Sequence, residues 1–398
     1  MLPSPYTPGD LPRVFVGRDR ERDLLKEPLA RVIAFGEMGG PLAIVTGPRG
    51  LGKTSLLREV ASLAESEGFI TAWISGLKHQ PFLSELVDQI ARALRRAGIE
   101  QEQRRTRLES LTLEVGIGLA KVGAKIATTS GSSVLPAPGL LGPLEELLHE
   151  SSTAIRDQGG AGLLIVIDEL HAPLESRGGR DATPEPAPLI DAAALLNVIQ
   201  NMGGDRRRYP LAIIGAGLPQ TKTALTHAAT FGERVKEIVL SGFDKQASEA
   251  LLTEAARPLG VTWAEDARAL AVERAAGYPQ ALQIVGDAAW RVAAPVLGGV
   301  VRREHVEAAL PIVDEAMGSM FRTRWEVATD HERSVLRAMA DIDGERVERG
   351  ELAARLGVAS DDLGMVRRSL IQKGIIEPAG RGLLRFTIPG FDDFVREQ

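Results

Sequence analysis

Short runs of apolar residues alternate with longer amphipathic segments through the first half of the chain. These runs lack the polar alternation of a half-exposed strand, so they predict strands that are buried on both faces. The runs cover residues 42–46, 69–74, 163–167 and 211–214, and residues 236–240 predict a further strand. Apolar residues at helical spacing fill the segments between several of the runs. We therefore predict an α/β fold in which helices cover both faces of a parallel sheet, an αβα sandwich.

The second half of the chain shows a different pattern. Residues 244–296 predict helices only, and residues 314–327 predict a bridging helix. Three short helices then precede a hairpin at 374–388, which is the order of a winged helix-turn-helix. These helices are expected at 331–340, 349–356 and 360–373. Gly357 marks the turn, and Ser360 is a good N-cap for the last of the three helices.

The patterns divide the chain into an α/β domain over residues 1–242, a helical lid over 243–328 and a winged helix-turn-helix domain over 329–398. One segment leaves two interpretations open. Alternation at 111–119 favours a strand or hairpin, and a stretch rich in Gly, Ser and Pro follows at 128–143. The segment is either a covered surface hairpin or an insertion that binds a partner.

Composition and charge limit the class of protein. A chain of 398 residues is too long for one ordinary core, and 44% hydrophobic with 25% charged residues indicates a folded soluble protein. The net charge of −6 argues against a basic coat for nucleic acid, although a local basic face stays open. The absence of cysteine excludes disulfides and thiolate metal sites and is compatible with the cytoplasm. No signal peptide and no membrane-spanning segment are expected.

The residues from Gly47 to Thr54 follow the first predicted strand and match the phosphate-binding pattern G-x-x-x-x-G-K-[ST]. The glycines allow backbone angles that point N–H groups at phosphate oxygens, and the N-terminus of the next helix adds partial positive charge. Lys53 is expected to reach the β- and γ-phosphates of ATP, and the Thr54 hydroxyl to ligate Mg²⁺. ATP and Mg²⁺ are therefore the predicted ligands.

An acidic pair, Asp168 and Glu169, ends the predicted strand at 163–167. Ligands of open α/β sheets bind at the carboxyl ends of the strands, where this pair is expected. Asp168 is expected to hold Mg²⁺, and Glu169 to act as the general base on the attacking water. His171 follows closely, but a lone histidine is more often structural, and we assign it no role.

These motifs resemble those of the AAA+ class of ATPases, and more closely the branch that contains the origin-recognition and STAND signalling ATPases. The box VGRDRE, which starts at Val16, is similar to the segment that touches adenine in that branch. Tyr278 and Pro279 lie in GYPQAL, which is similar to the lid motif that faces the nucleotide. The likeness covers nearly the whole chain and extends to a bacterial family called ATP-binding proteins. The implied nucleotide-binding residues are Val16, Gly17, Arg18, Gly47, Pro48, Arg49, Gly50, Leu51, Gly52, Lys53, Thr54, Ser55, Tyr278 and Pro279.

The chain departs from this class at three places. The strand at 211–214 runs into Gly215, Ala216 and Gly217, which offer no polar side chain as a nucleotide sensor. Gln280 stands near the lid position where many relatives carry a sensing arginine, and no arginine ends the fourth strand. Slow hydrolysis is therefore expected.

Arg234 precedes the fifth predicted strand, where the resemblance places an arginine that acts on the neighbouring subunit's nucleotide. The alternative is a surface ion pair. The resemblance thus implies a homo-oligomer or a protein partner, with activity that depends on assembly. The cluster at 206–208 is interpreted as a solvated helix end.

Basic residues also mark the third helix and the hairpin tip of the C-terminal domain. If this domain reads DNA, its contacts are expected to be Arg367, Arg368, Gln372, Lys373 and Arg381. Acidic and basic residues roughly balance there, and such domains in STAND proteins often pack only against protein. Three functions stay open: an ATPase that acts on DNA, an ATP-gated signalling switch, and a nucleotide-binding protein with negligible turnover.

Overall fold

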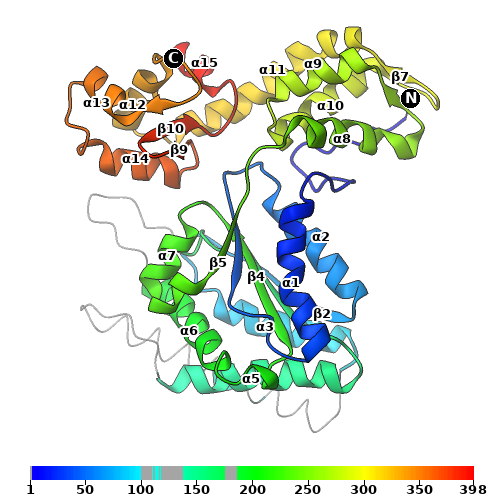
Figure 1. Cartoon of the computed structure of the whole chain (residues 1–398), viewed down its shortest axis with the longest axis vertical. Coiled ribbons are helices and arrows are strands. Elements are labelled where there is room, and N and C mark those ends of the chain that lie inside the picture. The colour runs from blue at the N-terminus through cyan, green and yellow to red at the C-terminus, as the bar shows by residue number, and fades with distance from the viewer. Residues whose placement is uncertain (1, 100–109, 111–112, 116, 118–137, 175–185) are drawn as a thin grey trace. The chain divides into compact units, whose positions relative to one another are not determined.

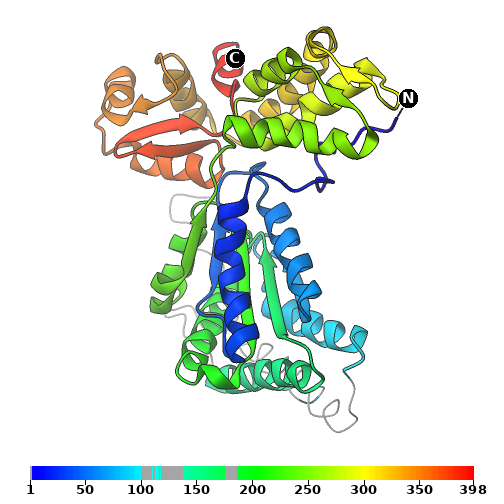
Figure 2. The ribbon, with the colours of Figure 1, turned by 45° about the vertical axis from the view of Figure 1, so that its right-hand side comes forward.

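The structure, a computed structural model, describes residues 2–99, 110, 113–115, 117, 138–174 and 186–398. The chain forms two compact units (Figures 1 and 2). The sheet unit contains Asp19–Thr46 and Leu56–Val239. The loop–lid unit contains Met1–Arg18, Gly47–Ser55 and Leu240–Gln398.

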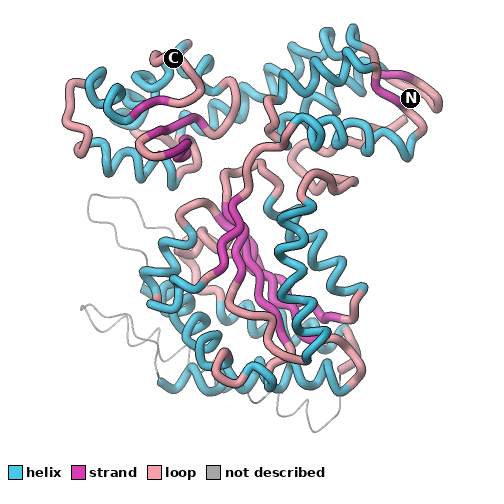
Figure 3. The backbone as a smooth tube through the Cα atoms, viewed as in Figure 1, coloured by secondary structure: helices cyan, strands magenta, loops and turns pink. Residues whose placement is uncertain are grey.

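The sheet unit is built on a parallel sheet, which has five strands in the described part of the chain, in the order β2-β3-β4-β1-β5. The strands are β1 (Ala43–Thr46), β2 (Phe69–Ser75), β3 (Gly162–Asp168), β4 (Leu211–Gly217) and β5 (Lys236–Val239). Every residue of β1, β3 and β4 is buried, as their continuous apolar runs predict. Figure 3 shows helices packed around these strands. The prediction of an α/β fold with a parallel sheet is confirmed.

Helices follow the strands in the sheet unit. They are α1 (Asp19–Phe35), α2 (Lys53–Ser66), α3 (Leu83–Arg96), α5 (Pro138–Asp157), α6 (Pro186–Met202) and α7 (Thr221–Ala228). Short 3-10 turns, η1 (Arg206–Arg208) and η2 (Thr230–Arg234), precede β4 and β5. α3 packs on β2, α5 on β3, and α1 on β4. The parallel register places the carboxyl ends of β1 and β3 at the same edge of the sheet, with β4 between them.

The prediction of a strand or hairpin over residues 111–119 was wrong. The described residues 110, 113–115 and 117 are helical, whereas period-two alternation favoured a strand. Val115 is buried but Leu113 and Ile117 are exposed, so the alternating residues do not share a buried face. α5 begins at Pro138, inside the stretch rich in Gly, Ser and Pro. Apolar residues at helical spacing outweigh its Gly and Pro content, because Leu140, Leu144, Leu147 and Leu148 are all fully buried. The rest of the predicted strand lies outside the described residues.

The lid part of the loop–lid unit consists of α8 (Lys245–Ala256), α9 (Glu265–Ala275), α10 (Pro279–Ala293) and the long α11 (Arg303–Glu326). Two short parallel strands, β6 (Thr262–Trp263) and β7 (Val300–Val301), interrupt the helices, which the wholly helical pattern did not predict. The Pro-rich N-terminal segment is held here by Tyr6. Its hydroxyl donates to the Leu252 carbonyl at 2.6 Å, and its ring meets the rings of Trp263 and Trp290 edge-on.

Residues after α11 form a C-terminal module with α12 (Asp330–Ala340), β8 (Val347–Glu348), α13 (Arg349–Leu356), α14 (Leu363–Gln372), β9 (Ile376–Gly380), β10 (Leu383–Phe386) and α15 (Phe391–Arg396). Within the described residues its antiparallel sheet has the order β8-β10-β9. The expected N-cap was wrong: α14 starts at Leu363, beyond Ser360. In the longer turn, the Asp362 carboxylate accepts the N–H of Ala359 at 3.2 Å.

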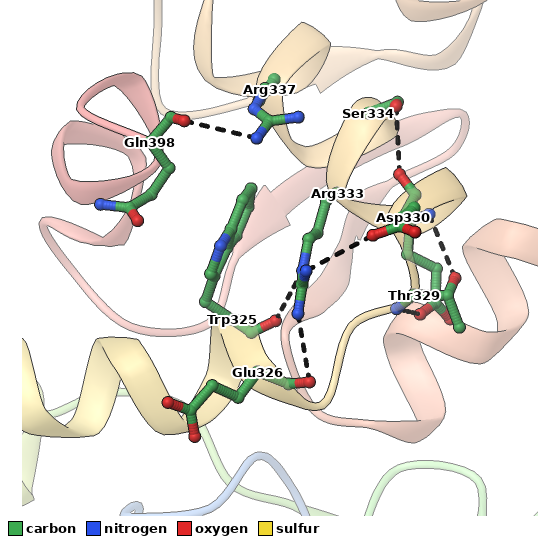
Figure 4. Close-up of polar contacts among 9 residues, drawn as sticks. Trp325, Glu326, Thr329, Asp330, Arg333, Ser334, Arg337 and Gln398 are labelled. Carbon is green, nitrogen blue, oxygen red and sulfur yellow. Dashed lines mark hydrogen bonds and ion pairs between the residues drawn. The ribbon is translucent and has the colours of Figure 1, made fainter.

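A joint of aromatic and arginine side chains connects α11 to this module (Figure 4). The guanidinium groups of Arg333 and Arg337 lie 5.5 and 5.1 Å from the centroid of a Trp325 ring. Arg333 also donates to the carbonyls of Trp325 and Glu326, which end α11. Arg337 donates to a carbonyl of Gln398 at the other end of the module. The module therefore packs directly against the end of α11 and is not joined to it by a linker alone.

Among the described residues, no helix is both long and apolar enough to cross a membrane.

Candidate functional site

The phosphate loop leaves the buried strand β1 at Gly47 and ends where α2 begins at Lys53. Gly50 and Gly52 have φ angles of +82° and +86°, which favour glycine because a Cβ strains this conformation. The Lys53 ammonium donates to the carbonyls of Gly47 and Pro48, both at 2.8 Å. Lys53 is buried. The loop thus combines a helix N-terminus with a lysine folded against its own backbone.

Arg18, from the VGRDRE box, contacts this loop directly. Its guanidinium donates to the carbonyl of Leu51 at 3.1 Å and to that of Ser241 at 2.6 Å. The same group lies 4.6 Å from the centroid of the Phe243 ring. Gly17 precedes it with φ of +71°. The structure therefore brings the predicted Arg18 to the loop, where it donates to backbone carbonyls.

Tyr278, from the GYPQAL motif, reaches the loop from the lid. Its hydroxyl donates to the Arg49 carbonyl at 2.7 Å, and the side chain is buried. Burial raises the pKa of Tyr278 to about 12, so the hydroxyl keeps its proton at neutral pH. Pro279 begins α10 and is buried. Both motifs carried over from the resemblance thus adjoin the phosphate loop.

Arg324 was missed by the sequence analysis. It lies in the last turn of α11 and is half-buried. Burial and the nearby positive charge of Arg49 lower its pKa. Within the described part of the chain, no carboxylate lies at ion-pair distance from it. A local pattern cannot reveal this residue, because only the fold brings the end of α11 close to Arg49 and Tyr278.

The acidic pair lies at the carboxyl end of β3. Asp168 is buried, and its Oδ1 accepts the N–H of Glu169 at 2.8 Å. Glu169 has a φ of +49°, a strained conformation for a residue with a side chain. The N–H of Leu170 donates to the carbonyl of Ala216 at 2.8 Å and ties this turn to β4. The Glu169 side chain stays 38% exposed, so solvent reaches its carboxylate.

His171 contacts this pair, although we assigned it no role. Its Nε2 lies 3.4 Å from Oε2 of Glu169, and the ring is almost fully buried. The sequence hinted at this contact only by placing His171 two residues beyond Glu169. That spacing is too common to predict a contact. The three glycine and alanine residues expected after β4 are part of that strand, from Gly215 to Gly217.

The candidate arginine for a neighbouring subunit, Arg234, ends η2 and is exposed. Its guanidinium lies 5.5 Å from the centroid of the Phe231 ring. No carboxylate of a described residue lies within 4 Å of it, so the alternative of a surface ion pair has no partner there. The cluster at Arg206–Arg208 is solvent-exposed, and Arg207 pairs with Glu37 at 3.4 Å.

The predicted DNA-contact residues differ in their surroundings. Arg368, Gln372 and Arg381 are exposed, whereas Arg367 is half-buried. The Lys373 ammonium is 2.5 Å from Oε2 of Glu332, a buried carboxylate that also accepts the Ser369 hydroxyl. In the described residues, no carboxylate lies at ion-pair distance from the three arginines of this set. The arginines therefore present uncompensated positive charge, while Lys373 is engaged within the module.

Comparisons with known proteins agree with this geometry. The model of the AAA ATPase domain matches residues 14–214, and a domain of unknown function matches residues 318–395. Among solved structures, a Walker-type ATPase of Pyrococcus abyssi is 17% identical, with a TM-score of 0.59 and 98% of each chain covered. The ORC2 protein of Aeropyrum pernix, in ADPNP–ADP complexes, is 14% identical, with a TM-score of 0.60 and 98% and 95% covered. These likenesses show a shared fold. No curated protein matches the chain.

Proposed function

Because this chain belongs to the AAA ATPase domain family, we propose that it binds ATP with Mg²⁺ and hydrolyses the ATP at the phosphate loop and the acidic pair. The observation that carries this proposal is the sheet itself. The loop follows β1, and Asp168 ends β3 at the same edge of a parallel sheet. This arrangement of the strands supports the proposal, because α/β sheets bind ligands at the carboxyl ends of their strands.

The residues present fit a magnesium–triphosphate ligand. The Thr54 hydroxyl and the Asp168 carboxylate are oxygen donors of the kind that Mg²⁺ prefers, and they would hold it. When bound, Mg²⁺ neutralises negative charge on the phosphate oxygens. Lys53 and the N–H groups of the loop bind the phosphates, and Glu169 takes a proton from the attacking water. Its exposed carboxylate supports that role, because water reaches it.

Replacing Lys53 with alanine tests the binding step. Charge-assisted hydrogen bonds each contribute about 1.5–3 kcal/mol, so we expect ATP affinity to fall at least about 100-fold. Titration calorimetry measures this, with Lys245→Ala, an exposed lysine at 79% exposure, as the control. Because Lys53 is buried, Lys53→Met and a thermal melt separate lost binding from lost stability. ATP affinity unchanged in both Lys53 variants contradicts the assignment of the loop.

We also propose that the chain divides into domains after residues 242 and 328. The last domain, residues 329–398, is a winged helix-turn-helix that contacts DNA. Its order of helices and strands and the uncompensated arginines on α14 and at the hairpin tip support this. The second candidate is an ATP-gated switch whose module packs against protein. The engagement of Lys373 by Glu332 and the packed joint at Trp325 favour that alternative.

Reversing both Arg367 and Arg368 to glutamate distinguishes these candidates. If α14 contacts phosphates, binding weakens, and the slope of log K against log salt falls by about 0.9 per lost contact. Mobility shifts at several salt concentrations provide the measurement. Arg322→Glu, an exposed arginine on α11, is the matched charge control. If the wild-type protein binds no DNA even at low salt, the packing role for the module is supported instead.

A further inference from the structure

Two side chains from outside the phosphate loop hold two of its peptide groups by their carbonyl oxygens. Tyr278 donates its hydroxyl proton to the Arg49 carbonyl at 2.7 Å. Arg18 donates to the Leu51 carbonyl at 3.1 Å. Both side chains are buried, at 2% and 4% exposure, so water does not compete strongly for these bonds.

Because of peptide geometry, these contacts also fix the direction of N–H groups on the other side of the loop. A trans peptide is planar, so the C=O of one residue and the N–H of the next point in opposite directions. With the Arg49 carbonyl held by Tyr278, the N–H of Gly50 points away from the tyrosine. With the Leu51 carbonyl held by Arg18, the N–H of Gly52 points away from the arginine. The two N–H groups belong to the loop glycines with left-handed backbone angles.

We propose that Tyr278 and Arg18 are positioning residues, which aim the N–H groups of Gly50 and Gly52 at the phosphates instead of contacting the nucleoside. This proposal rests on the proposed ATP site. It assigns to the two motifs a role that differs from the adenine and nucleotide contacts implied by the resemblance. Through these two residues, the loop therefore recognises the polyphosphate and not the nucleoside.

The packing around Gly50 supports this role. A Cβ added to Gly50 would lie 2.1 Å from the Tyr278 hydroxyl and 2.5 Å from Oε1 of Gln280. The lid therefore lies directly against the backbone of the loop. A tyrosine hydroxyl carries one proton, and this one is given to the Arg49 carbonyl. Oε1 of Gln280, at 3.5 Å from the same hydroxyl, is the more distant acceptor, so the proton is engaged within the loop and the lid.

Replacing Tyr278 with phenylalanine tests the proposal, because it removes the hydroxyl and keeps the ring. One lost hydrogen bond is worth about 1 kcal/mol, so affinity is expected to fall about fivefold. Calorimetry with ATP and with inorganic tripolyphosphate, each with Mg²⁺, is the measurement. A positioning role lowers both affinities by the same factor. A nucleoside contact lowers affinity for ATP and leaves tripolyphosphate unchanged, which would overturn the proposal.

The matched control is Tyr209→Phe, which removes another buried tyrosine hydroxyl, bonded to Glu145 in the sheet unit. It is expected to leave both affinities unchanged. Arg18→Met, combined with Tyr278→Phe, is expected to multiply the losses, because the two side chains hold different peptides. Hydrogen exchange of the loop amides gives a second readout and is expected to be faster in Tyr278→Phe.

The outcomes separate this inference from the proposed function. If Lys53→Ala retains ATP affinity, the ATP site itself is wrong. If Lys53→Ala loses ATP while Tyr278→Phe keeps both affinities and the wild-type exchange rates, only the positioning role is wrong.

Discussion

Replacing Glu169 with glutamine is expected to lower the rate of ATP hydrolysis by about 10²- to 10⁴-fold. The amide has nearly the same shape but cannot accept a proton from the attacking water. Affinity for ATP is expected to stay within about twofold, because binding depends on the loop and its lysine. The variant is therefore expected to hold ATP without turning it over. Phosphate release and calorimetry on the same preparation measure the two effects.

A second carboxylate variant controls for the loss of a charge near the sheet edge. Glu237 on β5 accepts the Thr46 hydroxyl at 2.7 Å, and Glu237→Gln is expected to hydrolyse ATP close to the wild-type rate. Asp168→Asn is expected instead to weaken the Mg²⁺-dependent part of ATP binding. Hydrolysis by Glu169→Gln at the wild-type rate would place the general base elsewhere.

Replacing Arg234 with alanine is expected to reduce turnover by about 10³-fold, since an arginine aimed at the transferring phosphate stabilises the charge of the transition state. ATP affinity is expected to persist, because Arg234 is exposed at the end of η2 and belongs to no part of the phosphate loop. If it acts on a neighbouring subunit, the rate per subunit rises with protein concentration. ATPase rates across a concentration series provide the measurement.

Mixing variants tests the same prediction without relying on concentration. Arg234→Ala keeps an intact loop, and Lys53→Ala keeps an intact arginine, so a mixture is expected to recover part of the activity. Arg207→Ala, an exposed arginine of η1, is the control and is expected to retain the wild-type rate. A rate per subunit that is independent of concentration, with no recovery on mixing, contradicts assembly dependence and favours the switch.

The sequence predicted the sheet and the two central motifs well, for a physical reason. Buried parallel strands are short, continuous apolar runs, and both motifs are local patterns that follow such runs directly. The structure extends the fourth strand to Gly217 and moves few other boundaries in the sheet. The place of Lys53 at the start of a helix, and of Asp168 at the end of a strand, required no long-range information.

The contacts around these motifs could not be predicted in the same way. Arg324 and Tyr278 lie far along the chain from Arg49, and only the fold brings them together. The strained angle of Glu169 and its approach to His171 occur in a turn that the Leu170–Ala216 hydrogen bond ties to β4. In the C-terminal module, a basic pattern could not show that one of its lysines is engaged by a buried glutamate.

The release of inorganic phosphate from ATP by the purified wild-type protein is the direct test of whether this chain is a Mg²⁺-dependent ATPase. It should be measured with and without Mg²⁺, at several protein concentrations, with Lys53→Ala purified in parallel as the blank. We predict slow release that requires Mg²⁺, exceeds the blank and is saturable in ATP. Release that is equal in the Lys53→Ala preparation, or no release from a wild-type protein that binds ATP, would contradict the account.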